Sequence, residues 1–123
     1  MPSTVQWSID VAVGGGPSLA ATSSFLADAY AVVEVVAPAT GSATEPFQAG
    51  TIAELSLVMI AASHYDPEDL TFTLGGETVA LDGPQLYVGA GMLGRFGADV
   101  AEITVDNDLE VDVTVTVLVG RRA

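Results

Sequence analysis

Strict alternation of apolar and polar residues is the feature that most constrains the fold of this chain. From Val111 to Val119 a valine stands at every second position, with acids, threonines and a single leucine between them. Successive side chains of a strand point to opposite faces of a sheet, so this period predicts a half-buried strand. The same period runs from Val5 to Val13, where the breaker Gly14-Gly15-Gly16-Pro17 ends it. Alternation near both ends of the chain favours a fold built from sheets.

The segments between these two strands continue the pattern. Residues 30–37 also fit helical spacing, but four valines and the closing Pro38 favour a strand. In the segment 70–81, two alternating runs flank Gly75-Gly76, which is the composition of a tight hairpin. Further strands are expected at 51–62, 85–88 and 101–106, with connections at 14–26 and 38–50. The sequence therefore predicts an all-β, single-domain sandwich or jelly-roll-like fold over 1–123, with seven to eight mostly antiparallel strands.

The charge balance limits the partners that this chain can have. Sixteen acids face three arginines and no lysine, which gives a formal charge of −13. A field of this sign repels phosphate backbones and anionic lipid surfaces, so neither nucleic acid nor a membrane is an expected partner. The N-terminus lacks the basic and apolar regions of an export signal, and the longest apolar run, Leu57 to Ala62, is too short to span a bilayer. We expect a soluble protein with no recognisable export signal.

Several predicted strands carry apolar residues on the face that a sandwich normally exposes. Residues 55–62 are apolar on both faces, so this strand must be covered twice, either by a loop of the same chain such as 14–29 or by another subunit. The second possibility is the main physical argument for a homo-oligomer. The two C-terminal arginines are expected against acidic surface of the same chain or of a neighbouring copy. The interface candidates are Val32, Val36, Ile52, Val58, Ile60, Leu118, Arg121 and Arg122.

Two motifs that carry chemistry in other proteins occur here without their usual context. Gly89-Ala-Gly91-Met-Leu-Gly94 matches the dinucleotide-binding fingerprint, but a strand follows where that fingerprint requires a helix, which favours a glycine-rich loop. His64 is the only histidine, and sequence neighbours such as Ser63 and Asp66 on a tight loop rarely converge as a catalytic triad. The absence of cysteine excludes thiolate metal sites and cysteine nucleophiles. No catalytic residue and no cofactor are expected.

Acidic residues gather at two places that make weak calcium candidates. One group is Asp66, Glu68 and Asp69, and the other includes Asp106 and Asp108. Calcium takes about six to eight oxygen ligands, but neither group has the EF-hand spacing. Asp-Pro and Asn-Asp are also residues that ordinary turns require. A solvated acidic face is therefore the favoured interpretation over a cation site.

Three stretches of the C-terminal half, Gly83 to Gly91, Ile103 to Asn107 and Val113 to Arg121, resemble small β-sandwich structural proteins of tailed bacteriophages. The resemblance implies a non-enzymatic virion component that decorates a capsid or forms part of a tail. It also implies self-association, with a trimer favoured among symmetric oligomers, and contact with a capsid or tail protein. An alternative function for such a fold is ligand binding, perhaps of carbohydrate, through loop aromatics such as Tyr65, Tyr87 or Phe96.

Overall fold

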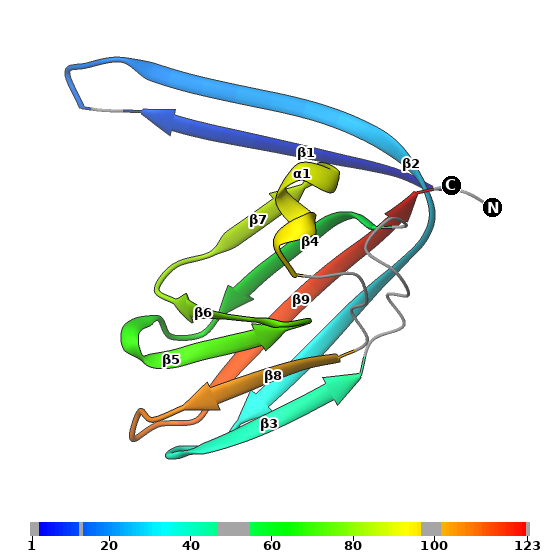
Figure 1. Ribbon diagram of the computed structural model, residues 1–123. Coiled ribbons are helices and arrows are strands. Elements are labelled where there is room, and N and C mark those ends of the chain that lie inside the picture. The colour runs from blue at the N-terminus through cyan, green and yellow to red at the C-terminus, as the bar shows by residue number, and fades with distance from the viewer. Residues whose placement is uncertain (1–2, 13, 47–54, 97–101, 123) are drawn as a thin grey trace.

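The chain forms two antiparallel β-sheets that pack face to face (Figure 1). The computed structural model describes residues 3–12, 14–46, 55–96 and 102–122. Nine strands lie within these ranges: β1 (Ser3–Ala12), β2 (Ser18–Ala37), β3 (Gly41–Pro46), β4 (Leu55–Ala62), β5 (Asp66–Leu74), β6 (Glu77–Leu81), β7 (Gln85–Val88), β8 (Glu102–Asn107) and β9 (Val113–Arg122). The five-stranded sheet, here called sheet A, has the order β1-β2-β9-β4-β7, and the four-stranded sheet B has the order β3-β8-β5-β6. The expected all-β, sandwich-like fold is confirmed.

The hydrophobic core lies between the two sheets and follows the alternation of the sequence. Every second residue of β9 from Val113 to Val119 is buried, and Phe72 of β5 and Ile103 of β8 are buried opposite them. The exception is Val111, which was expected to face inward with these valines. It is 46% exposed because it belongs to the turn before β9. Phe96 completes the core through an edge-on contact with Tyr87.

Three segments differ from the sequence-based expectation. Residues 14–26 do not form a connection, because β2 begins at Ser18 and pairs with β1 in a hairpin closed by Gly15, whose φ is 72°. The expected loop 38–50 contains β3, which raises the number of strands to nine. The glycine-rich loop contains a short helix, α1 (Gly89–Leu93), followed by a 3-10 turn, η2 (Gly94–Phe96). Burial of Leu93 and Phe96 stabilises these two turns against the core.

Strand β2 is unusually long and belongs to two pairings. Its first half pairs with β1, and its second half pairs with β9, with a shift in register between Ala27 and Ala29. At this point the ribbon bends, and β1 and the first half of β2 stand off the sandwich as a long hairpin (Figure 1). Residues 3–12 and 18–27, with the turn between them, are called the arm below.

A buried amide joins three segments at the opposite end of β2. Asn107 is 1% exposed and is the buried polar side chain of the described residues. Its Nδ2 group lies 3.2 Å from the carbonyl oxygen of Ala37, 3.1 Å from that of Pro38 and 2.8 Å from that of Val111. Its Oδ1 accepts a hydrogen bond from the Leu109 amide at 2.9 Å. One side chain therefore holds the end of β2, the end of β8 and the turn into β9.

The tight hairpin predicted at Gly75-Gly76 is present between β5 and β6. Gly75 has a φ of 60°, which a primed two-residue turn requires and which glycine adopts without steric cost. The Gly76 amide donates a hydrogen bond to the Phe96 carbonyl at 3.2 Å, so the turn also anchors η2. In the described part of the chain no helix has the length and apolar character needed to cross a bilayer.

Candidate functional site

The arm has one apolar face and one polar face. Cross-strand register places Val5 opposite Phe25, Ile9 opposite Ala21 and Val11 opposite Leu19. Directly opposite residues of an antiparallel pair share a face, so these side chains and Trp7 form one apolar surface. The other face carries Thr4, Gln6, Ser8 and Asp10 with Thr22 and Ser24. The alternation of β1 was therefore predicted correctly, but its apolar side is not part of the core between the sheets.

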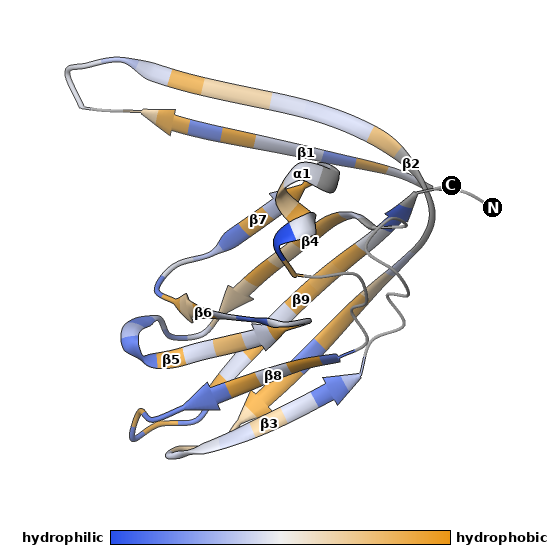
Figure 2. Cartoon of the chain, viewed as in Figure 1, coloured by the Kyte–Doolittle hydropathy of each residue, from blue (hydrophilic) through white to orange (hydrophobic). Residues whose placement is uncertain are grey.

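Sheet A presents a second apolar surface, on the side that faces away from sheet B. Register joins Leu118 to Val32 on one side and to Met59 on the other, and Met59 in turn to Leu86. The same row logic adds residues nearer to and farther from the arm. The outer face of sheet A, as the term is used here, consists of Tyr30, Val32 and Val36 of β2, Leu118 of β9, Leu57 and Met59 of β4, and Leu86 of β7. Figure 2 shows apolar residues along both the arm and these strands.

The two apolar surfaces meet at the base of the arm. The ring of Phe25 lies over Gly120, where a Cβ atom would stand 3.1 Å from the Phe25 Cζ atom and 3.9 Å from the Leu57 Cβ atom. Gly120 is buried under this ring, and Leu57 is buried although it belongs to the outer face. The absence of a side chain at Gly120 therefore allows the arm to approach sheet A at this point.

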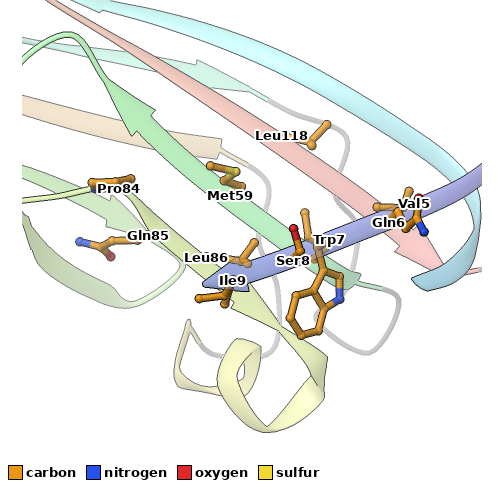
Figure 3. Close-up of a pocket in the computed structure, with 11 residues that line it drawn as sticks. Val5, Gln6, Trp7, Ser8, Ile9, Met59, Pro84, Gln85, Leu86 and Leu118 are labelled. Atoms are coloured by element: carbon orange, nitrogen blue, oxygen red, sulfur yellow. The ribbon is translucent and has the colours of Figure 1, made fainter. Parts of the chain in front are cut away.

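Beyond its base the arm separates from sheet A and leaves an open groove. The groove has a volume of about 530 Å³ and is lined by Val5, Trp7 and Ile9 of the arm and by Leu57, Met59, Leu86 and Leu118 of the outer face, together with Gln6, Ser8, Pro84 and Gln85 (Figure 3). Exposure increases toward the tip of the arm, from 42% at Ile9 to 60% at Val11 and 78% at Leu19. The arm and the sheet thus face each other with apolar side chains that the single chain leaves in water.

The interface candidates divide into different environments. Val32 and Val36 are exposed on the outer face, and Leu118 is partly buried in the groove. The outward placement of Val58 and Ile60 is wrong, because both are fully buried and face the core, with Val58 opposite Val119 and Ile60 opposite Val117. Ile52 lies outside the described residues, as does the side chain of Arg122.

Arg121 is partly buried near the end of β9, in register with Ala29 and Leu55. The acids Glu110 and Asp112 precede the other end of this strand. At about 3.3 Å per residue, the strand separates Arg121 from them by more than 20 Å. A pair within one chain is therefore not formed, and a pair between subunits stays a prediction.

The two acidic groups approach each other through their backbones but not through their carboxylates. The Asp108 amide donates to the Asp69 carbonyl at 2.8 Å. One Asp66 carboxylate oxygen accepts from the amides of Asp69 at 2.8 Å and Glu68 at 2.9 Å, and these bonds hold its pKa below the ordinary value. Asp106 and Asp108 are exposed. Within the described ranges no three acidic or histidine side chains are grouped to hold a metal ion.

The loop around His64 is organised by local hydrogen bonds. Ser63 Oγ and His64 Nδ1 are 3.0 Å apart, and the same hydroxyl accepts the Thr114 amide at 3.0 Å. The Asp66 carboxylate faces the backbone of its own turn. A serine, a histidine and an aspartate are thus close in sequence without forming a relay from carboxylate to imidazole to hydroxyl.

The aromatic side chains considered for carbohydrate binding lie mostly inside the protein. Phe96 is fully buried, and Tyr87 is 5% exposed with its hydroxyl donating to Gln85 Oε1. Burial raises the pKa of Tyr87, although the nearby Arg95 opposes this shift. Tyr65 is exposed, and its hydroxyl accepts the Ala62 amide at 2.9 Å. Two of the three rings are therefore not available to stack on a sugar.

No protein-family model, curated protein or solved structure matches this chain. The resemblance of the C-terminal half to phage structural proteins accordingly stays a prediction. The largest departure from a closed sandwich is the pair of apolar surfaces on the arm and on sheet A. Sequence reasoning missed the arm because the half of β2 that completes it, residues 18–27, is rich in serine, alanine and threonine and has no strong apolar period.

Proposed function

We propose that this protein is a non-enzymatic structural subunit that works by assembling with other copies of itself. The observation that carries the proposal is the apolar arm that faces an apolar sheet across an unfilled groove. Monomeric soluble proteins rarely leave contiguous apolar patches of this kind in water, and such patches commonly mark interaction sites. Together with the resemblance of the C-terminal half, this favours a virion component that decorates a capsid or forms part of a tail, with a trimer as the favoured oligomer.

The charge distribution supports association through these surfaces in particular. Of the sixteen acids in the chain, Asp10 alone lies within residues 3–12 and 18–27. The centre of a protein interface is typically depleted of charged residues. Two copies that each carry a charge of −13 repel one another over most of their surfaces, so close approach costs least at the arm.

The test is the molar mass in solution, measured by size-exclusion chromatography with light scattering over a range of protein concentrations. The variant Val11→Ser/Leu19→Ser removes two apolar side chains that are exposed in the single chain, so the fold of the sandwich should be retained. Burying each side chain in an interface contributes about 1.5–3 kcal/mol, so association should weaken by at least about a hundredfold. The expected result is an oligomeric wild type and a smaller species for the variant at the same concentration.

The matched control is the exchange Ala12→Ser/Ser18→Ala, which alters the neighbouring cross-strand pair on the opposite face of the arm and keeps the composition. This control should retain the mass of the wild type. A wild type that stays monomeric up to its solubility limit would overturn the proposal. Equal dissociation of the control and the Val11/Leu19 variant would also contradict assembly through the apolar face.

A further inference from the structure

We infer that assembled copies exchange arms, so that the arm of one subunit lies with its apolar face on the outer face of sheet A of the neighbouring subunit. The inference rests on the proposed function and specifies how the self-association takes place. Its partner is a second copy of this chain, because every copy carries both halves of the contact. The two halves are the arm face with Val5, Trp7 and Ile9 and the sheet face with Leu57, Met59 and Leu118.

The first argument is that the arm does not close on its own sheet. Packed sheets lie about 10 Å apart with interdigitating side chains. Here a groove of about 530 Å³ remains between the arm and sheet A, although both sides are apolar (Figure 3). Phe25 makes close contact at the base, whereas Leu19 near the tip is 78% exposed. The contact surfaces match in chemistry but are held apart by the bend of the single chain.

The second argument is that the arm can move as a unit without loss of its own hydrogen bonds. In the described part of the chain, β1 pairs with β2 and with no other strand. The β2–β9 register shifts between Ala27 and Ala29, which is where the arm leaves the sandwich. A change of backbone angles at this irregularity would redirect the arm and preserve both ladders. Phe25 lies on the arm side of the shift, so it can occupy the position over Gly120 of the neighbour.

The third argument comes from the free edge of β1. This edge strand is ten residues long and contains neither lysine nor proline, the residues with which proteins usually protect an exposed edge. The other edge strands are shorter: β7 has four residues, β6 has five, and β3 has six and ends at Pro46. An arm that lies between two subunits is covered, whereas an arm that extends from a monomer exposes both its edge and its apolar face.

The test uses disulfide trapping, which is simplified because the chain contains no cysteine. The variants Ile9→Cys, on the arm, and Met59→Cys, on the outer face, are purified separately, mixed, allowed to exchange subunits and treated with a mild oxidant. Both residues line the same groove, so arm exchange places the two thiols of different chains together. The expected product is a heterodimer with the mass of one Ile9→Cys chain plus one Met59→Cys chain, measured by intact mass spectrometry.

The matched control is Ala20→Cys mixed with Met59→Cys, because Ala20 is exposed on the opposite face of the arm, in register with Asp10. Arm exchange requires at least fivefold more heterodimer from the Ile9→Cys mixture than from this control. Equal yields would overturn arm exchange, and so would a predominant Ile9→Cys homodimer, which would indicate arm-to-arm contact. If these results come from a protein that light scattering shows to be oligomeric, self-assembly stands and arm exchange fails. A monomeric protein overturns both.

Discussion

The substitution Asn107→Ala should destabilise the sandwich far more than any change to the acids beside it. Asn107 Nδ2 lies within hydrogen-bonding distance of three carbonyl oxygens, and Oδ1 accepts the Leu109 amide. An amide group carries two protons, so at most two of the three carbonyls receive a full hydrogen bond. Two donated bonds and one accepted bond are therefore lost, each with a net contribution of about 1 kcal/mol.

The expected loss is about 3 kcal/mol in the free energy of unfolding. Pro38 and Val111 are exposed, so water can replace the amide at their carbonyls, but Ala37 is fully buried. For a domain of this length, a loss of this size lowers Tm by roughly 10 °C. The measurement is urea unfolding followed by far-UV circular dichroism, since the single tryptophan, Trp7, lies on the arm and reports on the arm rather than on the core.

Two further variants make this test specific. Asp108→Ala alters an exposed side chain next to Asn107 and should change the stability by no more than about 0.5 kcal/mol. Asn107→Asp keeps the shape but directs a carboxylate at carbonyl oxygens, so it should be less stable than Asn107→Ala at neutral pH and recover part of the loss in acid. If Asn107→Ala and Asp108→Ala unfold within about 0.5 kcal/mol of each other, the hydrogen-bonded role of Asn107 is wrong.

Two other predictions follow from single contacts. Gly75→Ala should prevent the β5–β6 turn from packing and lower Tm by well over 10 °C, because the new Cβ atom would stand 1.7 Å from the Phe96 carbonyl oxygen and the φ of 60° disfavours a side chain. Gly76→Ala, where nothing lies within 4 Å, is the control, and equal melting temperatures would refute the reasoning. Asp66 has a pKa below its ordinary value because the Asp69 and Glu68 amides bind its carboxylate, so its stabilising effect is present above the ordinary pKa and is lost as pH falls through the lowered one. Thermal melts from neutral pH to acid should therefore show a smaller acid-dependent loss for Asp66→Asn than for the wild type, and superimposable pH profiles would contradict this.

Where the amino-acid pattern has one apolar and one polar face, the structure follows the prediction. The last strand buries its valines from Val113 onward, and the hairpin at Gly75-Gly76 turns where two alternating runs meet. In β4 both faces are apolar, so alternation identifies a strand but not its inward side. The pairing of Ile60 with Val117 decides this, and that partner lies 57 positions later in the chain. Long-range pairing thus placed Val58 and Ile60 in the core and left Met59 on the outer face.

The candidate surface was predicted only in part for a related reason. Val32 and Val36 stand out in the sequence because they flank Glu34, and both are exposed on the outer face. The arm was not predicted, because the small residues of 18–27 give no periodic signal and form a strand only through their ladder with β1. The short helix α1 is comparable, since its glycines favour a loop while Leu93 and Phe96 bring the segment onto the core.

Charge and apolar surface are separated in this protein, and this separation has a consequence for assembly. A charge of −13 keeps copies apart at long range, and salt reduces the repulsion over a Debye length of about 8 Å at physiological ionic strength. The arm projects the neutral, apolar part of the chain away from the acidic sandwich (Figure 1). An encounter between an arm and an outer face therefore meets less repulsion than an encounter between two acidic surfaces. The same charge that keeps the protein soluble thus selects, among possible contacts, the one in which arms are exchanged, and this contact should strengthen as salt is added.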